Sequence, residues 1–389
     1  MGTDPRAAPP DGARASLMTV LREWTRIGVT GFGGPPAHIA LLRDLVVGRR
    51  GWLDARAFED ANAACTLLPG PASTQMAIYC AYRVAGPAGA VVGGLGFIVP
   101  AVIAVIALSA VLFGQAPPLW IRGAGAGAGA AVAAVALRAA RGLVRPSLDR
   151  ARERTAVGWW AAYLVAGAAG AVFAGPYLAL VLVGCGAVEL VRRHGGAATR
   201  LPVIAPVAVV AQGGLGALAW TALKVGALSF GGGFVIIPLM QGDAVHTYHW
   251  MTNGQFLNAV ALGQVTPGPV VATVAAVGYA AYGVSGGAMA AAIAFAPSFL
   301  FVLIAGRHFE RLRENPRPRA FLDGAGPAAI GAIGGAAITL AIVLSETWQF
   351  AVLAAAAVAL LVLRRGVVTT LLVAALTGTV AALAGAPLP

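Results

Sequence analysis

Eight long apolar runs, separated by short polar segments, leave this chain little choice of fold. They cover residues 89–113, 123–143, 156–174, 177–191, 286–306, 325–344, 347–363 and 366–387. Most of them approach the roughly 20 residues that an α-helix needs to cross a bilayer. Charged residues make up only 11% of the chain, whereas a typical soluble domain has about 25%. We therefore predict an all-α integral membrane protein, a polytopic helical bundle.

The net charge of +12 comes from Lys and Arg residues that lie mostly in short segments between the apolar runs. This distribution is the positive-inside pattern of membrane proteins, so we interpret the charge as topogenic and do not expect a nucleic-acid partner. Residues 1–15 are polar and proline-rich, which predicts a disordered cytoplasmic tail without a removable signal peptide. Cys65, Cys80 and Cys185 are scattered and have no CxxC or His cluster beside them, so we expect packing residues, no metal and no cofactor.

An internal repeat divides the chain. Sliding the sequence by 198 residues aligns 26–90 with 224–288 without a gap and gives 17 identities in 65 positions. The identities include Phe32-Gly33-Gly34 with Phe230-Gly231-Gly232 and Pro69-Gly70-Pro71 with Pro267-Gly268-Pro269. Because they fall on Gly, Pro, Trp and Phe and not only on Ala, they indicate an ancient duplication. We assign residues 16–200 to the first repeat and 201–389 to the second.

Loop charge predicts how the two repeats are oriented. Residues 48–56 carry three arginines, but their counterpart 246–254 has no Lys or Arg. In the next pair of equivalent loops the contrast reverses, since 114–120 is neutral and 307–319 is rich in arginine. Equivalent loops should therefore face opposite compartments, which predicts inverted-topology repeats of the kind found in many secondary transporters. This scheme also places 243–252 outside the cell.

Four stretches rich in glycine and proline interrupt the expected helices: "GFGGPP" (31–36), "LPGPAS" (68–73), "SFGGGF" (229–234) and "TPGPVV" (266–271). A break in a membrane helix is tolerated where it lines a protein-enclosed, hydrated cavity. Each break can expose a new helix N-terminus, whose free N–H groups and positive dipole end attract anions. We therefore predict broken helices or re-entrant hairpins that converge on an oxyanion cage. The alternative is helix packing through small residues, which we expect for "GAGAGAGAGAA" after Arg122.

The candidate substrate-binding residues lie in or beside these breaks. In the first repeat they are Arg26, Phe32, Gly33, Gly34, His38, Pro69, Gly70, Ser73, Thr74 and Gln75, and in the second Lys224, Ser229, Gly231, Gly232, Gln264, Gly268 and Thr273. Arg26 and Lys224 occupy matching positions six residues before the two FGG motifs. A cation deep in a bilayer is costly, so its duplication suggests use, although both side chains could instead snorkel to an interface.

No enzymatic set of residues stands out. His38 could contact substrate, carry a proton or serve only the structure. Glu59, Asp60 and Glu189 are the acidic residues that the sequence places within the membrane. Glu59 and Asp60 could couple transport to Na⁺ or H⁺, but we favour their interpretation as charges at the start of a helix. We therefore predict no catalytic residues. A non-transporting scaffold or sensor is the rival from another class, and a membrane enzyme comes third.

At these residues the chain resembles the chromate ion transporter family in its long, two-domain form. The resemblance is carried by "GFGGPPAHIALLRDLVVGRRGWLDARAF" and "LLPGPASTQMAIYCAYRVAG", and by "SFGGGFVIIPLM" and "GQVTPGP" in the second half. It implies an efflux carrier for chromate in the plasma (inner) membrane, with chromate resistance as the outcome. Sulfate or another tetrahedral oxyanion is the alternative substrate. The family's short members work in pairs, and we also hold a homodimer of this chain as a hypothesis.

Two residues depart from the family pattern. Thr66 stands where such proteins usually have a glutamine before the first "LPGP", whereas Gln264 is kept in the second copy. Ala72 stands where a polar residue often follows that motif. The resemblance therefore predicts an asymmetric site.

Overall fold

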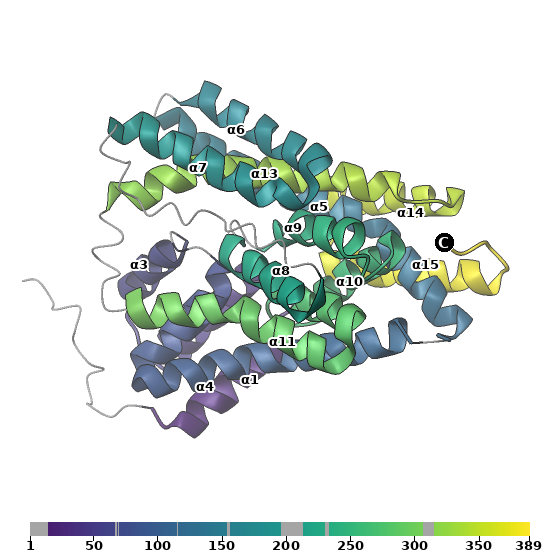
Figure 1. Cartoon of the computed structure of the whole chain (residues 1–389). Coiled ribbons are helices and arrows are strands. Elements are labelled where there is room, and N and C mark those ends of the chain that lie inside the picture. Colours follow the sequence, from purple (N-terminus) through teal and green to yellow (C-terminus); the bar gives the residue numbers. More distant parts are fainter. Residues whose placement is uncertain are drawn as a thin grey trace, which may run out of the picture.

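The computed structural model describes residues 15–66, 68, 70–114, 116–153, 156–195, 213–229, 233–305 and 315–389. Within these ranges the regular structure is helical throughout and includes no strand, so the predicted all-α class is confirmed (Figure 1). The predicted tail at 1–15 lies almost wholly outside the described residues.

The first half of the chain runs through seven α-helices with short π-helical and 3-10 segments between them. In order they are α1 (Leu17–Thr30), α2 (Pro35–Arg43), η1 (Asp44–Arg49), α3 (Ala55–Cys65), α4 (Ala72–Leu112), α5 (Leu119–Glu153), α6 (Val157–Ala169), η2 (Gly170–Ala174), η3 (Gly175–Tyr177) and α7 (Leu178–His194). The second half holds α8 (Gly214–Leu228), α9 (Ile236–Gln241), η5 (Gly242–Thr247), α10 (Asn253–Val265), η6 (Val270–Thr273), α11 (Val274–Ala305), α13 (Pro316–Ile342), α14 (Thr347–Ala357), η8 (Val358–Val362) and α15 (Val367–Leu383).

The same succession of elements occurs in both halves. The π-helical segments η1 and η5 are offset by 198 residues, which is the offset of the sequence repeat. The long helices α4 and α11 each bend at a glycine with positive φ, Gly86 at 70° and Gly283 at 62°. The similarity also extends beyond the aligned sequence, because α6 and α14 both continue into a π-helical segment. The structure thus supports a duplication, and the inversion of the second copy stays a prediction.

Five helical segments are long and apolar enough to cross a membrane within the part of the chain that the structure describes. They are Ala72–Leu112, Leu119–Arg152, Val157–His194, Val270–Ile304 and Pro316–Ile342. Shorter apolar helices cover Gly214–Leu228, Thr347–Val362 and Val367–Leu383. Together with the composition, these segments establish a multi-pass membrane protein.

The two halves exchange their last helices. Helices α6 and α7 of the first half pack against α13 of the second, and α14 and α15 of the second pack against α5 of the first (Figure 1). Small residues make this close approach possible: Gly127 meets the carbonyl of Ala374, and Gly324 meets the carbonyl of Cys185. The glycine-rich run after Arg122 is therefore a packing surface, as its sequence predicts.

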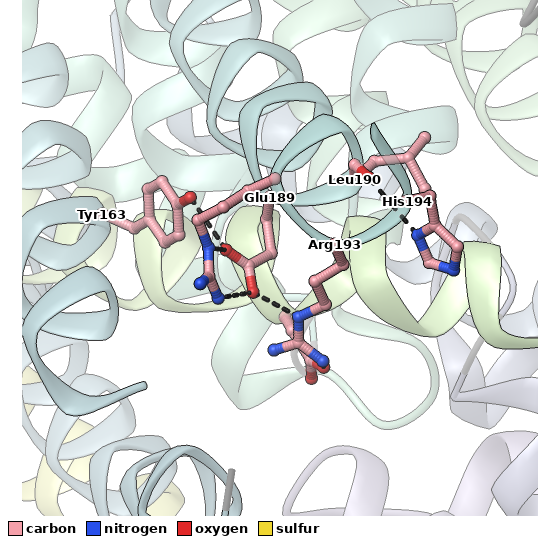
Figure 2. A network of polar contacts seen from close by, with 7 residues as sticks. Tyr163, Glu189, Leu190, Arg193 and His194 are labelled. Atoms are coloured by element: carbon pink, nitrogen blue, oxygen red, sulfur yellow. Dashed lines mark hydrogen bonds and ion pairs between the residues drawn. The ribbon is translucent and has the colours of Figure 1, made fainter. Parts of the chain in front are cut away.

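An ionic cluster fixes the end of α7 to its neighbours. Glu189 accepts hydrogen bonds from Tyr163 on α6 and from the guanidinium groups of Arg192 and Arg193, and Arg193 also pairs with Asp323 on α13 (Figure 2). Glu189 is buried, and its carboxylate forms ion pairs with both arginines. This acidic residue thus has a structural explanation.

Candidate functional site

The four breaks lie where the sequence predicts them, and glycines with positive φ mark each one. Gly33 and Gly34 have φ of 103° and 74°, Gly70 has 114°, Gly233 has 87° and Gly268 has 97°. Glycine adopts these angles without the steric cost that a Cβ brings. Helix α2 starts at Pro35 within the first break, and α4 starts at Ala72 within the second.

The folded chain brings the breaks together across the two halves. The amide of Gly268 donates to the carbonyl of Gly31 over 3.0 Å, which joins the second PGP motif to the first FGG motif. Val270 lies beside the other glycines, because a methyl group on Gly34 would be 3.8 Å from it and one on Gly233 would be 3.6 Å from it. Three of the four breaks therefore meet around one point.

The fourth break reaches the opposite half in an equivalent way. A methyl group on Gly70 would lie 3.1 Å from the carbonyl oxygen of Gly226 on α8, and one on Gly268 would lie 3.3 Å from that of Gly28 on α1. Each PGP glycine thus abuts the first helix of the other repeat. The interior of the protein is built from both repeats at this place.

His38 links two breaks of the first half and is fully buried. Its Nε2 lies 3.0 Å from the carbonyl oxygen of Gly31, which can only accept, so Nε2 carries the proton. Its Nδ1 lies 3.5 Å from the hydroxyl of Ser73, and its ring meets Phe97 edge to face. These contacts give His38 a structural role between "GFGG" and "PAS".

Free backbone donors are concentrated at the PGP breaks. In α4, Thr74 and Gln75 donate to the carbonyl of Pro71, so the amides of Ala72 and Ser73 precede the first intrahelical bonds. In η6, the amide of Ala272 donates to the carbonyl of Pro269, so the amides of Val270 and Val271 also precede the first hydrogen bond of their helix. Such groups at a helix start can bind an anion.

The start of α2 is a poorer anion site than the sequence suggests. Pro35 and Pro36 have no N–H group, and the amides of Ala37 and His38 both donate to the carbonyl of Gly34. The expectation that every break offers several free N–H donors is therefore wrong for "GFGGPP". Its glycines instead allow the close approach of Val270.

Several buried hydroxyl and amide groups near the breaks have no hydrogen-bond partner within the described residues: Thr74 Oγ1, Ser229 Oγ, Gln264 Nε2 and Ser298 Oγ. Ser298 lies on α11, 3.6 Å from where a methyl group on Gly70 would be. It is absent from the sequence prediction, because a lone serine in an apolar helix carries no motif. Unpaired buried polar groups are costly, so their presence beside the breaks favours a polar ligand or water there.

Lys224 does not point an unpaired charge at the breaks. Its Nζ lies 2.5 Å from Oδ2 of Asp243 on η5, and both side chains are buried. Thr221 donates to the same carboxylate oxygen over 2.7 Å. The loop-charge scheme places Asp243 in an external segment, and the structure shows that its side chain is buried and paired.

Arg26 differs from its counterpart Lys224 because its side chain is exposed. It lines a hollow together with Thr19, Arg22, Glu23 and Arg50. Arg26 and Lys224 thus occupy equivalent positions of the repeat but have different surroundings, since Arg26 is exposed and Lys224 is buried. Glu23, a buried acid that no sequence motif marks, pairs with Arg50 at 2.6 Å.

The remaining predicted residues fall into three groups. Ser73, Thr74, Gln75, Ser229, Gln264 and Thr273 are buried, and the hydroxyl of Thr273 donates to the carbonyl of Val270. Phe32 is exposed, and Glu59 forms an exposed pair with Arg43. Pro69, Gly231 and Gly232 lie outside the described residues.

Taken together, the breaks offer neutral donors: backbone amides, hydroxyl groups and side-chain amides. Neutral donors can replace part of the hydration shell of an oxyanion without holding it as tightly as a fixed cation would. No group of His, Cys, Asp and Glu residues in the described ranges could hold a metal ion. The arrangement suits reversible anion binding.

Comparison with known proteins gives a consistent result. The family described as chromate transporter matches residues 18–190 and 216–381. A chromate transport protein of Cupriavidus metallidurans is 33% identical over 86% of this chain and 87% of its own length. One of Pseudomonas aeruginosa is 32% identical over 87% and 84%, and a probable chromate transport protein of Synechococcus elongatus is 30% identical over 84% of each. No solved structure matches the chain.

Proposed function

Because this chain belongs to the chromate transporter family, we propose that it is a secondary transporter that exports chromate across the plasma membrane. The observation that carries the proposal is the convergence of helix breaks from both halves, through Gly268 on Gly31 and Val270 between Gly34 and Gly233. Broken helices at the interface of two repeats are where secondary transporters bind their substrates.

The cage binds the oxyanion through the donors of the PGP breaks. The amides at the start of α4 and η6 supply backbone N–H groups, and Thr74, Ser229, Gln264 and Ser298 supply side-chain groups without partners among the described residues. Gly33 and Gly70 keep the backbone close to the ligand. The buried pair of Lys224 with Asp243 leaves this binding to neutral groups in the conformation described.

The membrane potential favours export. A dianion that leaves a cell with a negative interior gains roughly 4.6 kcal/mol for every 100 mV, twice the gain of a single charge. Import of the same ion would need a coupled cation. The membrane potential therefore favours the outward direction for chromate.

Sulfate is the second candidate substrate, because it is a tetrahedral dianion like chromate and neutral donors recognise the two in the same way. Uptake of labelled chromate and labelled sulfate into inside-out vesicles measures both activities in one preparation. Faster chromate uptake, abolished by Gly33→Leu, supports the proposal. Sulfate uptake that exceeds chromate uptake at equal concentration assigns the carrier to sulfate, and the absence of flux for both refutes transport.

The assignment of 16–200 and 201–389 to two inverted repeats belongs to the same proposal, as does the hypothesis of a homodimer. Alternating access then consists of one repeat moving against the other around the cage. The exchanged packing of α13 and α5 supplies the interface across which such a movement would occur.

A further inference from the structure

We propose that the hollow beside α1 is a cytoplasmic capture site, which draws the oxyanion in before it reaches the cage. This inference rests on the proposed function and names a second site for the same ligand. The hollow has a volume of about 520 Å³ and is lined by Thr19, Arg22, Glu23, Arg26 and Arg50. Every one of these side chains is polar, and three of them are guanidinium groups.

The hollow carries an excess of positive charge. Glu23, the one acid among the described residues that line it, pairs with Arg50 at 2.6 Å and approaches Arg49 at 4.0 Å. Arg22 and Arg26 form no ion pair within the described residues. They are four residues apart on one helix, where like charges repel. An anion bound in the hollow would offset the repulsion between these two guanidinium groups and so stabilise the folded helix.

The hollow lies close to the first break. Helix α1 ends at Thr30, directly before Gly31, whose carbonyl takes part in the contact between the repeats. Arg26 and Gly31 are five positions apart, which corresponds to roughly 7.5 Å along a helix axis. A guanidinium group that faced hydrocarbon here would be costly, so the exposed side chains of Arg22 and Arg26 must face water or an anion.

The described residues of the second repeat do not reproduce the free cations of this hollow, so the hollow distinguishes one side of the protein from the other. The positions that correspond to Arg22 and Arg50 are Trp220 and Tyr248 in the second repeat, and the cation that corresponds to Arg26 is Lys224, which Asp243 neutralises. The arginine-rich segment 48–56 marks the side of the hollow as cytoplasmic. An exporter collects its substrate from that side, and a positive hollow there raises the local concentration of a dianion.

The sharpest test compares two double variants that remove the same charge. The test variant combines Arg22→Gln with Arg26→Gln and so removes the two cations of the hollow that form no ion pair within the described residues. The control combines Arg317→Gln with Arg319→Gln and removes two exposed arginines at the start of α13. In inside-out vesicles the first variant should raise the KM for chromate about tenfold, within the range of electrostatic steering. Its maximal rate should stay close to wild type, and the control and Arg22→Lys with Arg26→Lys should keep the wild-type KM.

Two further readouts separate capture from a structural effect. Added salt should shrink the difference in KM, because about 0.1 M salt screens charges beyond ~10 Å. In right-side-out vesicles, where the cage is approached from the other face, the variant and wild type should have the same KM. An unchanged KM in inside-out vesicles, or a loss confined to the maximal rate, would overturn the capture site.

A phospholipid headgroup offers the same phosphate-like chemistry as a free oxyanion. Proteoliposomes of phosphatidylcholine, with and without phosphatidylglycerol, distinguish the two sources. If the KM difference persists in phosphatidylcholine alone, the free oxyanion is the ligand. If it occurs only with phosphatidylglycerol, the hollow is a lipid site and the capture proposal is wrong. Wild-type protein without chromate or sulfate flux would instead refute the proposed function, before any variant is compared.

Discussion

The ammonium group of Lys224 lies 2.5 Å from the carboxylate of Asp243, within the interior of the second repeat. The equivalent positions of the first repeat hold no such pair, because Leu45 stands at the position of Asp243 and the corresponding Arg26 is exposed. The two halves therefore share a backbone plan while their charges differ. This asymmetry leads to the first prediction.

Replacing Asp243 by Asn should lower the free energy of unfolding by about 3–5 kcal/mol, because a buried ammonium group loses its partner. The Lys224→Met, Asp243→Asn double variant should recover much of this loss. Denaturant titration of the purified protein measures both. As a control, Glu59→Gln breaks the exposed pair with Arg43 and should cost about 0–1 kcal/mol. Equal losses for Asp243→Asn and Glu59→Gln would show that the buried pair contributes nothing special.

Gly70→Ala should impair transport, since φ is 114° and the added methyl group would meet Gln75 Nε2 at 2.9 Å and the carbonyl of Gly226 at 3.1 Å. Strained backbone of this kind costs about 1–3 kcal/mol. Gly51 also has positive φ, but a methyl group there meets nothing within 4 Å, so Gly51→Ala is the matched control. The initial rate of chromate uptake should fall for Gly70→Ala only. Equal rates in the two variants would remove Gly70 from the site.

His38→Phe should destabilise the protein by about 1–3 kcal/mol, because it removes one of the two donors to the buried carbonyl of Gly31. His38→Gln keeps a donor on a side chain of similar reach and should recover part of the stability. If His38 only holds the breaks together, His38→Gln should transport chromate with the pH profile of wild type. A profile that loses a titration step in this variant would assign proton transfer to His38.

Glu189→Gln should cost about 2–3 kcal/mol, since the charges of Arg192 and Arg193 lose their shared buried partner. Asp149→Asn is the control, because Asp149 and Arg152 are 3.7 Å apart and both are exposed. Thermal unfolding of the purified variants distinguishes them. A melting temperature for Glu189→Gln equal to that of the control would mean that the cluster in Figure 2 does not hold α7 in place.

The sequence predicts the helical class and the breaks because both depend on local properties. Apolar runs report helices that face lipid, and glycine next to proline reports where a helix cannot continue. Gly33, Gly70 and Gly268 have the positive φ that these motifs favour. The repeat also locates η1 and η5 relative to each other, although no residue pattern predicts that these segments are π-helical.

What the sequence does not show depends on contacts between distant segments. Asp243 follows an apolar stretch, as a loop residue would, and its burial depends on contacts with Lys224 and Thr221 of α8. Ser298 faces Gly70 because α11 passes the first PGP break. The exchange of α13 and α5 between the halves pairs glycines with carbonyls far along the chain, which local pattern does not encode.

The central claim is that the breaks form a cage through which a dianion leaves the cell. The most direct test is uptake of labelled chromate into inside-out vesicles under an imposed potential, with Gly33→Leu as the inactive reference. We predict uptake that increases when the vesicle interior is made positive and that is lost in Gly33→Leu. Uptake that is the same in wild type, Gly33→Leu and vesicles without the protein would contradict the account.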